Sequence, residues 1–108
     1  MKKQLIWLSY DLGINGDYPN LYSWLDSHNA RECGDSMAAF EFEYQKNLVA
    51  ELKQALKRTL KTKKSDRIYL IYKNEECKLK GSFIIGRRKP APWKGYAQIS
   101  EPGFEDEG

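Results

Sequence analysis

The sequence predicts one α+β domain, and three observations support this fold class. A chain of 108 residues is long enough for one hydrophobic core and too short for two. Apolar residues make up 41% and aromatic residues 13% of the chain, which suffices for a modest core. Along the chain, segments with a strand pattern alternate with segments whose apolar residues recur at helical spacing.

The first strand is expected at residues 4–10. This run is short, apolar and rich in residues that favour strands, and turn-forming residues follow it at 11–16. It is typical of a buried central strand that enters a loop. A short helix follows, capped by Asp17 or the next residue, with Pro19 in its first turn and its end near Asn29.

The second strand is expected at residues 37–44, after a turn at 34–36. Its side chains alternate with period two, so aromatic residues occupy one face and glutamates the other: Phe40, Phe42 and Tyr44 against Glu41 and Glu43. This pattern indicates a half-buried strand.

A longer helix follows from residue 45, where the period of the apolar residues changes. Its apolar stripe recurs every three or four residues and consists of Leu48, Val49, Leu52, Ala55, Leu56 and Leu60. The opposite face is basic, with Lys53, Lys57, Arg58 and Lys61.

The last part of the chain predicts further strands. Residues 67–72 are β-branched and aromatic, which indicates a central strand, and residues 83–85 indicate a short one. Pro90 and Pro92 cannot donate backbone hydrogen bonds to a sheet, so this segment is expected to be a stiff connector and not part of a central strand. Residues 94–99 are expected to form a final edge strand.

This order of elements predicts a ferredoxin-like βαββαβ sandwich. Two helices would cover one face of an antiparallel sheet, with an extra C-terminal strand as a possible addition. The other sheet face would stay open unless a partner covers it. We expect one domain at residues 1–99 and a flexible acidic tail at 100–108.

The compartment is expected to be the cytoplasm, with no membrane association. The longest uncharged apolar run, residues 5–10, is far too short to span a bilayer. Met1, Lys2 and Lys3 are not followed by a signal-peptide cleavage site. Cys33 and Cys77 fit reduced thiols, and their spacing does not suggest zinc.

The distribution of charge favours a polyanionic partner. The net charge is +3, but residues 100–108 hold four acidic and no basic residues. Residues 1–99 therefore carry 18 basic and 11 acidic residues, a net +7. A basic body is compatible with nucleic-acid binding, and ordinary surface solubility is the alternative.

Two groups of cations are candidates for phosphate contact. One lies on the basic helix face and the loop after it, and the other is an arm after residue 86, where cations alternate with Trp93 and Tyr96. The alternatives are a solvated helix face and a dimerisation arm. The expected nucleic-acid-binding residues are Lys57, Arg58, Lys61, Lys64, Arg87 and Arg88.

Asp11 is the candidate for chemistry, because it ends the first strand and opens a glycine-containing loop. Mg²⁺ is usually held by one or two carboxylates with waters and phosphate oxygens, and a two-fold dimer would supply a second Asp11. The alternative is a local hydrogen bond that shapes the loop. Asp17 and Asp35 are better explained as a helix cap and a turn residue, and His28 as a residue at a helix end.

Residues 5–12 (Leu-Ile-Trp-Leu-Ser-Tyr-Asp-Leu) resemble the first strand of the CRISPR-associated protein Two family and of virulence-associated protein D. The order of elements up to about residue 85 is similar as well. The resemblance implies a ferredoxin-like homodimer in which Asp11 is a catalytic, metal-binding residue of a nuclease. Residues 13–16 lack the arginine expected soon after the aspartate, and residues 90–96 have no assigned counterpart.

The functional prediction is therefore a nucleic-acid-binding homodimer that acts on DNA or RNA. In its catalytic form it would be a Mg²⁺-dependent endonuclease that uses Asp11 as catalytic and metal-binding residue. The alternative is a non-enzymatic protein-interaction or regulatory module, whose open sheet face docks a partner. A component of a toxin, phage or defence system fits either function.

Overall fold

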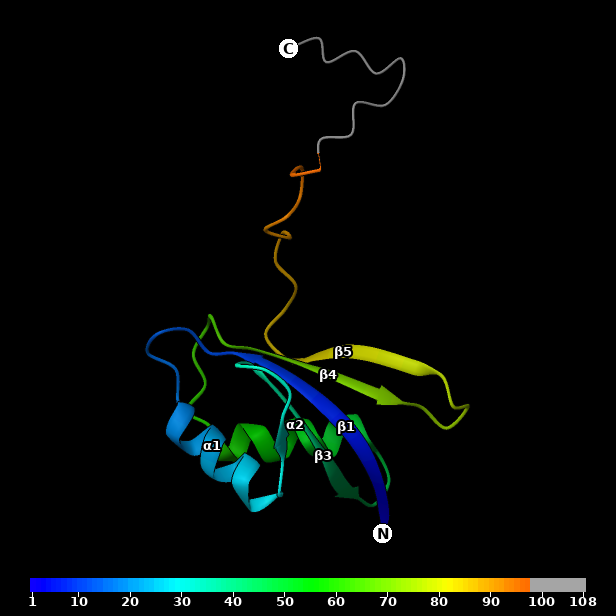
Figure 1. Cartoon of the computed structure of the whole chain (residues 1–108). Helices are drawn as coiled ribbons and strands as arrows, with labels where there is room; N and C mark the ends of the chain where they lie inside the picture. Colours follow the sequence, from blue (N-terminus) through cyan, green and yellow to red (C-terminus); the bar gives the residue numbers. More distant parts are fainter. Residues whose placement is uncertain (98–108) are drawn as a thin grey trace, which may run out of the picture.

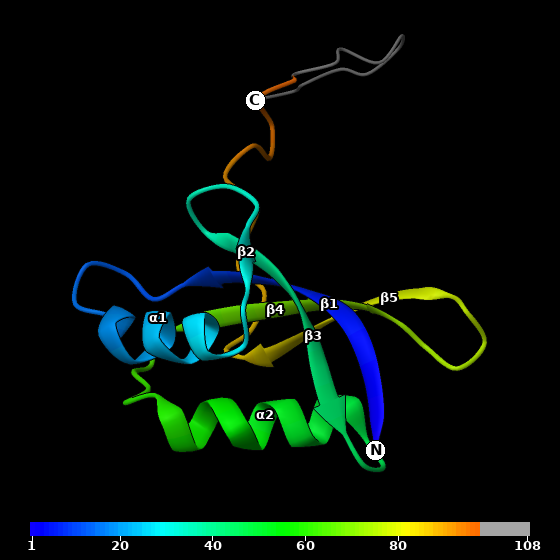
Figure 2. The ribbon, with the colours of Figure 1, turned by 60° about the horizontal axis from the view of Figure 1, so that its bottom comes forward.

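Five antiparallel strands and two helices make up the α+β fold of the computed structural model, which describes residues 1–97 (Figure 1). The elements are β1 (Lys2–Asp11), α1 (Tyr18–Ser27), β2 (Arg31–Glu32), β3 (Met37–Tyr44), α2 (Leu48–Thr59), β4 (Arg67–Lys73) and β5 (Leu79–Ile85). The strand order in the sheet is β2-β3-β1-β4-β5. Both helices lie on the same side of the sheet (Figures 1 and 2).

β1 is the central strand, as its apolar sequence predicts. It pairs with β3 on one side and β4 on the other, with Ile6 opposite Phe40 and Leu8 opposite Leu70. These four side chains are buried between the sheet and the helices. Because successive strand residues point to opposite faces, the intervening side chains of β1 lie on the open face of the sheet.

α1 begins as predicted. The Asp17 carboxylate accepts hydrogen bonds from the Asn20 backbone N–H and side-chain amide, and Pro19 lies in the first turn. Asp17 also accepts the backbone N–H of Lys61, beyond the end of α2, at 2.9 Å. One carboxylate therefore joins the start of α1 to the end of α2.

α2 confirms the predicted amphipathic helix. Asn47 caps it by accepting the backbone N–H of Ala50 at 2.9 Å. The buried leucines of its apolar stripe, Leu48, Leu52 and Leu56, face the sheet core. Among residues 1–97, neither helix is long and apolar enough to cross a membrane.

Two strands differ from the sequence prediction. The two-residue strand β2 was not predicted, because such a short segment carries no periodic pattern; it pairs with Ala38 and Ala39 of β3. β5 was predicted only at residues 83–85, but it begins at Leu79. Its first half is exposed, because β4 is its only partner among the described strands, and it lacks the apolar pattern of a buried strand.

The predicted edge strand at residues 94–99 is wrong for the part that the structure describes. Residues 92–96 form turns, with hydrogen bonds from Lys94 N–H to Ala91 O and from Tyr96 N–H to Trp93 O. Gly95 has a φ of 85°, in the left-handed region, which is incompatible with an extended strand. Residues 98–99 and the predicted acidic tail at 100–108 lie outside the described residues.

Candidate nucleic-acid interface

Asp11 lies on the open sheet face, where β1 ends beside the first residue of β4. Its Oδ2 is 3.2 Å from Nη2 of Arg67, the residue directly opposite in the pairing of β1 with β4. Its Oδ1 accepts the Gly13 backbone N–H at 3.3 Å, which is the loop-shaping bond considered as the alternative role. The Asp11 side chain is still 60% exposed, so its carboxylate is accessible to solvent.

An aromatic pair with an arginine over it lies next to this ion pair. Tyr69 of β4 and Phe83 of β5 are directly opposite, and their rings meet edge to face with centroids 4.8 Å apart. The Arg88 guanidinium carbon lies 5.3 Å from the Phe83 centroid and 5.8 Å from the Tyr69 centroid, within cation–π range. These three residues, with Ser9, Asp11 and Arg67, line a hollow of about 290 Å³, called here the aromatic hollow.

Gly81 determines where the Tyr69 ring lies. A Cβ added at Gly81 would clash with Tyr69 Oη and lie 2.7 Å from Tyr69 Cζ. The ring therefore lies over the backbone of β5 in space that only glycine leaves free. This arrangement keeps the ring close to the sheet and beside Phe83.

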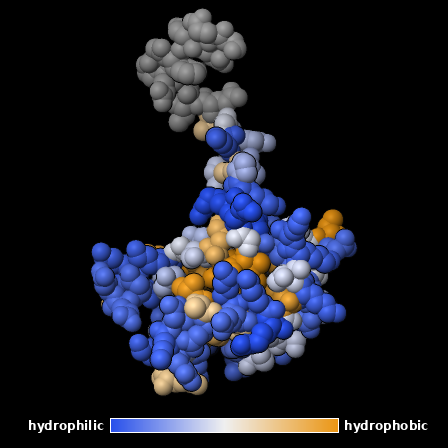
Figure 3. All heavy atoms as spheres, turned by 180° about the vertical axis from the view of Figure 1, so that it is seen from behind, coloured by the Kyte–Doolittle hydropathy of each residue, from blue (hydrophilic) through white to orange (hydrophobic). Residues whose placement is uncertain are grey.

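A second hollow lies between α2 and β5. It measures about 230 Å³ and is called here the lysine hollow, because four of its lining residues are Lys53, Lys57, Lys63 and Lys64. Phe83 lines this hollow as well as the aromatic hollow. Cations therefore flank the C-terminal end of β5 on both of its sides. Figure 3 shows hydrophobic side chains gathered in the middle of the side seen from behind, with hydrophilic side chains around them.

Among the residues that the structure describes, carboxylates neutralise few of the cations that line the two hollows. Residues 1–97 contain three ion pairs, Lys2–Glu75, Arg67–Asp11 and Lys78–Glu76. Arg67 is thus the one hollow-lining cation with a carboxylate partner in the described chain. Asp66 also lines the lysine hollow, but it is buried, and its Oδ2 accepts the Lys63 backbone N–H at 2.7 Å.

The structure brings together only some of the predicted phosphate-contacting residues. Lys57 and Lys64 line the lysine hollow, and Arg88 lines the aromatic hollow. Arg87 is exposed and follows Gly86, which lines the lysine hollow, so it lies in the chain between the two groups. Arg58 and Lys61 are exposed but line neither hollow.

Sequence reasoning missed Arg67, Tyr69 and Phe83 as members of one site. The sequence shows all three only as residues of predicted strands. The signal that would have joined them is strand register, because Asp11 faces Arg67 and Tyr69 faces Phe83 only in the observed pairing. A single amino-acid sequence does not reveal that register.

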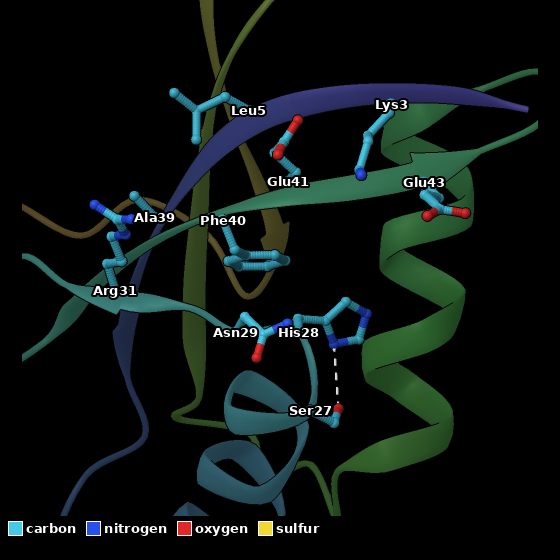
Figure 4. A pocket seen from close by; sticks show the side chains of 10 residues that line it. All are labelled: Lys3, Leu5, Ser27, His28, Asn29, Arg31, Ala39, Phe40, Glu41 and Glu43. Atoms are coloured by element: carbon cyan, nitrogen blue, oxygen red, sulfur yellow. Dashed lines mark hydrogen bonds between the residues drawn. The ribbon is translucent and has the colours of Figure 1, made fainter.

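A larger hollow, of about 930 Å³, lies at the opposite edge of the sheet. Figure 4 shows its lining, which mixes cations and carboxylates such as Arg31 and Glu41. His28 at its border has Nδ1 2.8 Å from Trp24 O, and its ring packs against Trp24. His28 is the C-terminal cap of α1, as the sequence predicted. Because the lining of this larger hollow mixes cations and carboxylates, it matches a polyanion less well than the two hollows at β5 do.

Within the part of the chain that the structure describes, no cluster of further ligands surrounds the predicted metal site. No group of three or more His, Cys, Asp or Glu side chains within residues 1–97 is arranged to hold a metal ion. A second Asp11 from a partner subunit, or phosphate oxygens of a nucleic acid, would be suitable further ligands for Mg²⁺ at Asp11. Catalysis by Asp11 therefore stays a prediction.

Comparisons of the chain with protein-family models, with curated proteins and with solved structures found no match. The resemblance of residues 5–12 to the CRISPR-associated family thus stays a prediction too. A functional assignment has to be argued from the site itself.

Proposed function

We propose that this protein binds nucleic acid at the C-terminal end of β5. The observation that carries the proposal is the convergence of cations on both sides of that strand. The lysine hollow contributes ammonium groups, among them those of Lys57 and Lys64, and the aromatic hollow contributes the guanidinium groups of Arg67 and Arg88. Both groups belong to the basic part of the chain, where residues 1–99 carry a net +7.

Phosphate groups are the ligands that fit these cations on both sides of β5. Lysine ammonium groups on flexible stems neutralise phosphates without requiring a fixed geometry, and each neutralised phosphate releases counterions. Arginine beside aromatic rings suits contact with both the backbone and the bases. A polyanion that passes around the edge strand β5 would meet both groups of cations.

We also propose that the domain is ferredoxin-like. The strand order β2-β3-β1-β4, with α1 and α2 on one side, supports this proposal, and β5 adds a strand beyond β4. A homodimer with Mg²⁺-dependent nuclease activity at Asp11 is the more specific form implied by the resemblance of residues 5–12. In that form, Asp11 would contact the metal, and the cations near β5 would hold the phosphates.

Binding of labelled oligonucleotides, measured by fluorescence anisotropy over a salt series, tests the proposal. If about four phosphates are neutralised, raising KCl from 50 to 200 mM weakens binding of a single strand roughly 50-fold. A Lys57→Ala/Lys64→Ala variant should bind more weakly, and its salt slope should fall by about 1.4.

The matched control is Lys2→Ala/Lys78→Ala, which removes the same charge from the paired lysines that line neither hollow. Its salt slope should equal that of the wild type. Equal effects of the two double variants would show that only net charge matters and would contradict the assigned site. A complete absence of binding at 50 mM KCl would favour the protein-interaction module instead.

A further inference from the structure

We infer that the open sheet face selects unpaired nucleic-acid strands by stacking bases on Tyr69 and Phe83, an inference that rests on the proposed nucleic-acid binding. These two residues are called here the aromatic platform. The cations around β5 do not by themselves distinguish single strands from duplexes, whereas exposed aromatic rings do. It follows from the position, support and surroundings of the two rings.

The position of the platform makes the rings available. Tyr69 and Phe83 are partly exposed, and they belong to the sheet face that neither helix covers. Ser9 lies beside Tyr69 in the adjacent strand, and its small side chain leaves that flank of the ring open. A planar base can therefore approach the platform from solvent.

The support of the platform keeps the rings in place before a ligand arrives. Tyr69 lies over Gly81 and meets the edge of Phe83, so rotation of either ring is limited by the other and by the backbone of β5. Both rings stand on paired strands, β4 and β5, rather than on a loop. Rigid aromatic groups lose little conformational freedom on binding, which favours stacking.

Arg88 shows that a planar group fits on the platform. Its guanidinium carbon lies over both rings at 5.3 and 5.8 Å. Arg88 is exposed and follows β5, so it is held by no strand pairing. A base that stacks on the rings would displace the Arg88 guanidinium, whose charge would then lie beside the phosphate of the same nucleotide.

Only an unpaired strand can use this surface. In a duplex, the faces of the bases are stacked on one another and only their edges reach the grooves, so two rings on a sheet cannot contact them. Every base has a π face, which makes such stacking tolerant of sequence. The expected ligand class is therefore single-stranded DNA or RNA, bound without strong sequence preference.

The test compares three ligands of equal length at one salt concentration: a single strand, the matched duplex and an abasic single strand. The abasic strand keeps the phosphates and lacks the bases. We expect the ordinary single strand to bind about tenfold more tightly than the abasic strand. We expect Tyr69→Leu or Phe83→Leu to remove most of this difference without weakening the binding of the abasic strand.

Two further variants separate stacking from folding. Gly81→Ala keeps both aromatic residues but displaces the Tyr69 ring, so it should also reduce binding of the ordinary strand and leave the abasic strand unchanged. Tyr22→Leu alters an exposed tyrosine on α1, on the other side of the sheet, and should change neither affinity. Circular dichroism checks that each variant is folded, and any one folded platform variant suffices for the comparison.

The possible failures can be told apart. If ordinary and abasic strands bind equally, or if all folded platform variants bind like the wild type, the stacking inference is overturned while nucleic-acid binding stands. Tighter binding of the duplex than of the single strand would overturn it in the same way. If none of the three ligands binds, the proposed function itself fails.

Discussion

Asp17 shows how one side chain can connect two helices. Its carboxylate accepts hydrogen bonds from Asn20 at the start of α1 and from the backbone N–H of Lys61 beyond α2. These bonds, that of Lys61 first, hold the pKa of the Asp17 carboxyl below its usual value. Glu51 behaves similarly, because three backbone N–H groups, of Gln45, Lys46 and Asn47, lower its pKa.

The lowered pKa values predict a loss of stability in acid. A carboxyl group whose pKa is lower in the folded state stabilises the fold fully above its unfolded pKa of about 4, and this contribution disappears as the pH falls through the folded pKa. Asp17→Ala should therefore lower the melting temperature at pH 7 and flatten its decrease between about pH 5 and pH 2. Thermal unfolding at a series of pH values measures both effects.

The control for this prediction is Asp26→Ala, which removes an exposed aspartate near the other end of α1. Its curve of melting temperature against pH should follow that of the wild type more closely than the curve of Asp17→Ala does. If Asp17→Ala and the wild type show the same curve, the hydrogen bonds of Asp17 do not contribute to acid stability.

At the scale of elements, α2 contributes to both the core and the candidate site. Leu52 and Leu56 are completely buried on one face of the helix, while Lys53 and Lys57 line the lysine hollow. Successive residues of a helix point in directions 100° apart, so one helix serves both purposes. The position of these lysines next to β5 thus depends on the packing of the leucines.

We predict that Leu52→Ala destabilises the domain by about 2–5 kcal/mol, because it removes buried methyl groups and leaves a cavity. Gln54→Ala, at an exposed position of the same helix, should change the free energy of unfolding by less than about 0.5 kcal/mol. Urea denaturation measures both values. A small effect of Leu52→Ala would indicate that α2 is not firmly packed on the sheet, which would weaken the case for the lysine hollow.

At the scale of the whole molecule, Asp11 connects the sequence prediction of catalysis with that of a homodimer. Within one chain, its carboxylate is engaged by Arg67 and the Gly13 N–H. A second Asp11 from a partner subunit would supply the additional carboxylate that a Mg²⁺ site between two copies needs. The two predictions should therefore succeed or fail together.

We predict that the wild-type protein sediments as a dimer and cleaves nucleic acid with Mg²⁺ or Mn²⁺. Asp11→Asn should abolish cleavage and keep nucleic-acid binding, because Arg67 then loses its charged partner and stays available to phosphate. Asp35→Asn, at an exposed turn position, is the control and should cleave like the wild type. A monomeric wild type without cleavage would reduce the role of Asp11 to its ion pair and its loop hydrogen bond.

The amino-acid sequence determined the local features of this protein. Alternation predicted β3, runs of strand-favouring residues predicted β1 and β4, and helical spacing predicted both helices. Asp17 with Pro19 predicted the start of α1. All of these signals depend on neighbouring residues. The two-residue strand β2 and the exposed half of β5 carry no such pattern.

Only the tertiary structure decided which residues share a site. Asp11 meets Arg67 across 56 positions of the chain, and Tyr69 meets Phe83 and Arg88 from different segments. These contacts depend on strand order and register, which result from packing the whole sheet against the helices. For the same reason, the basic residues that the sequence predicted to contact phosphate divide between the lysine hollow, the aromatic hollow and positions that line neither.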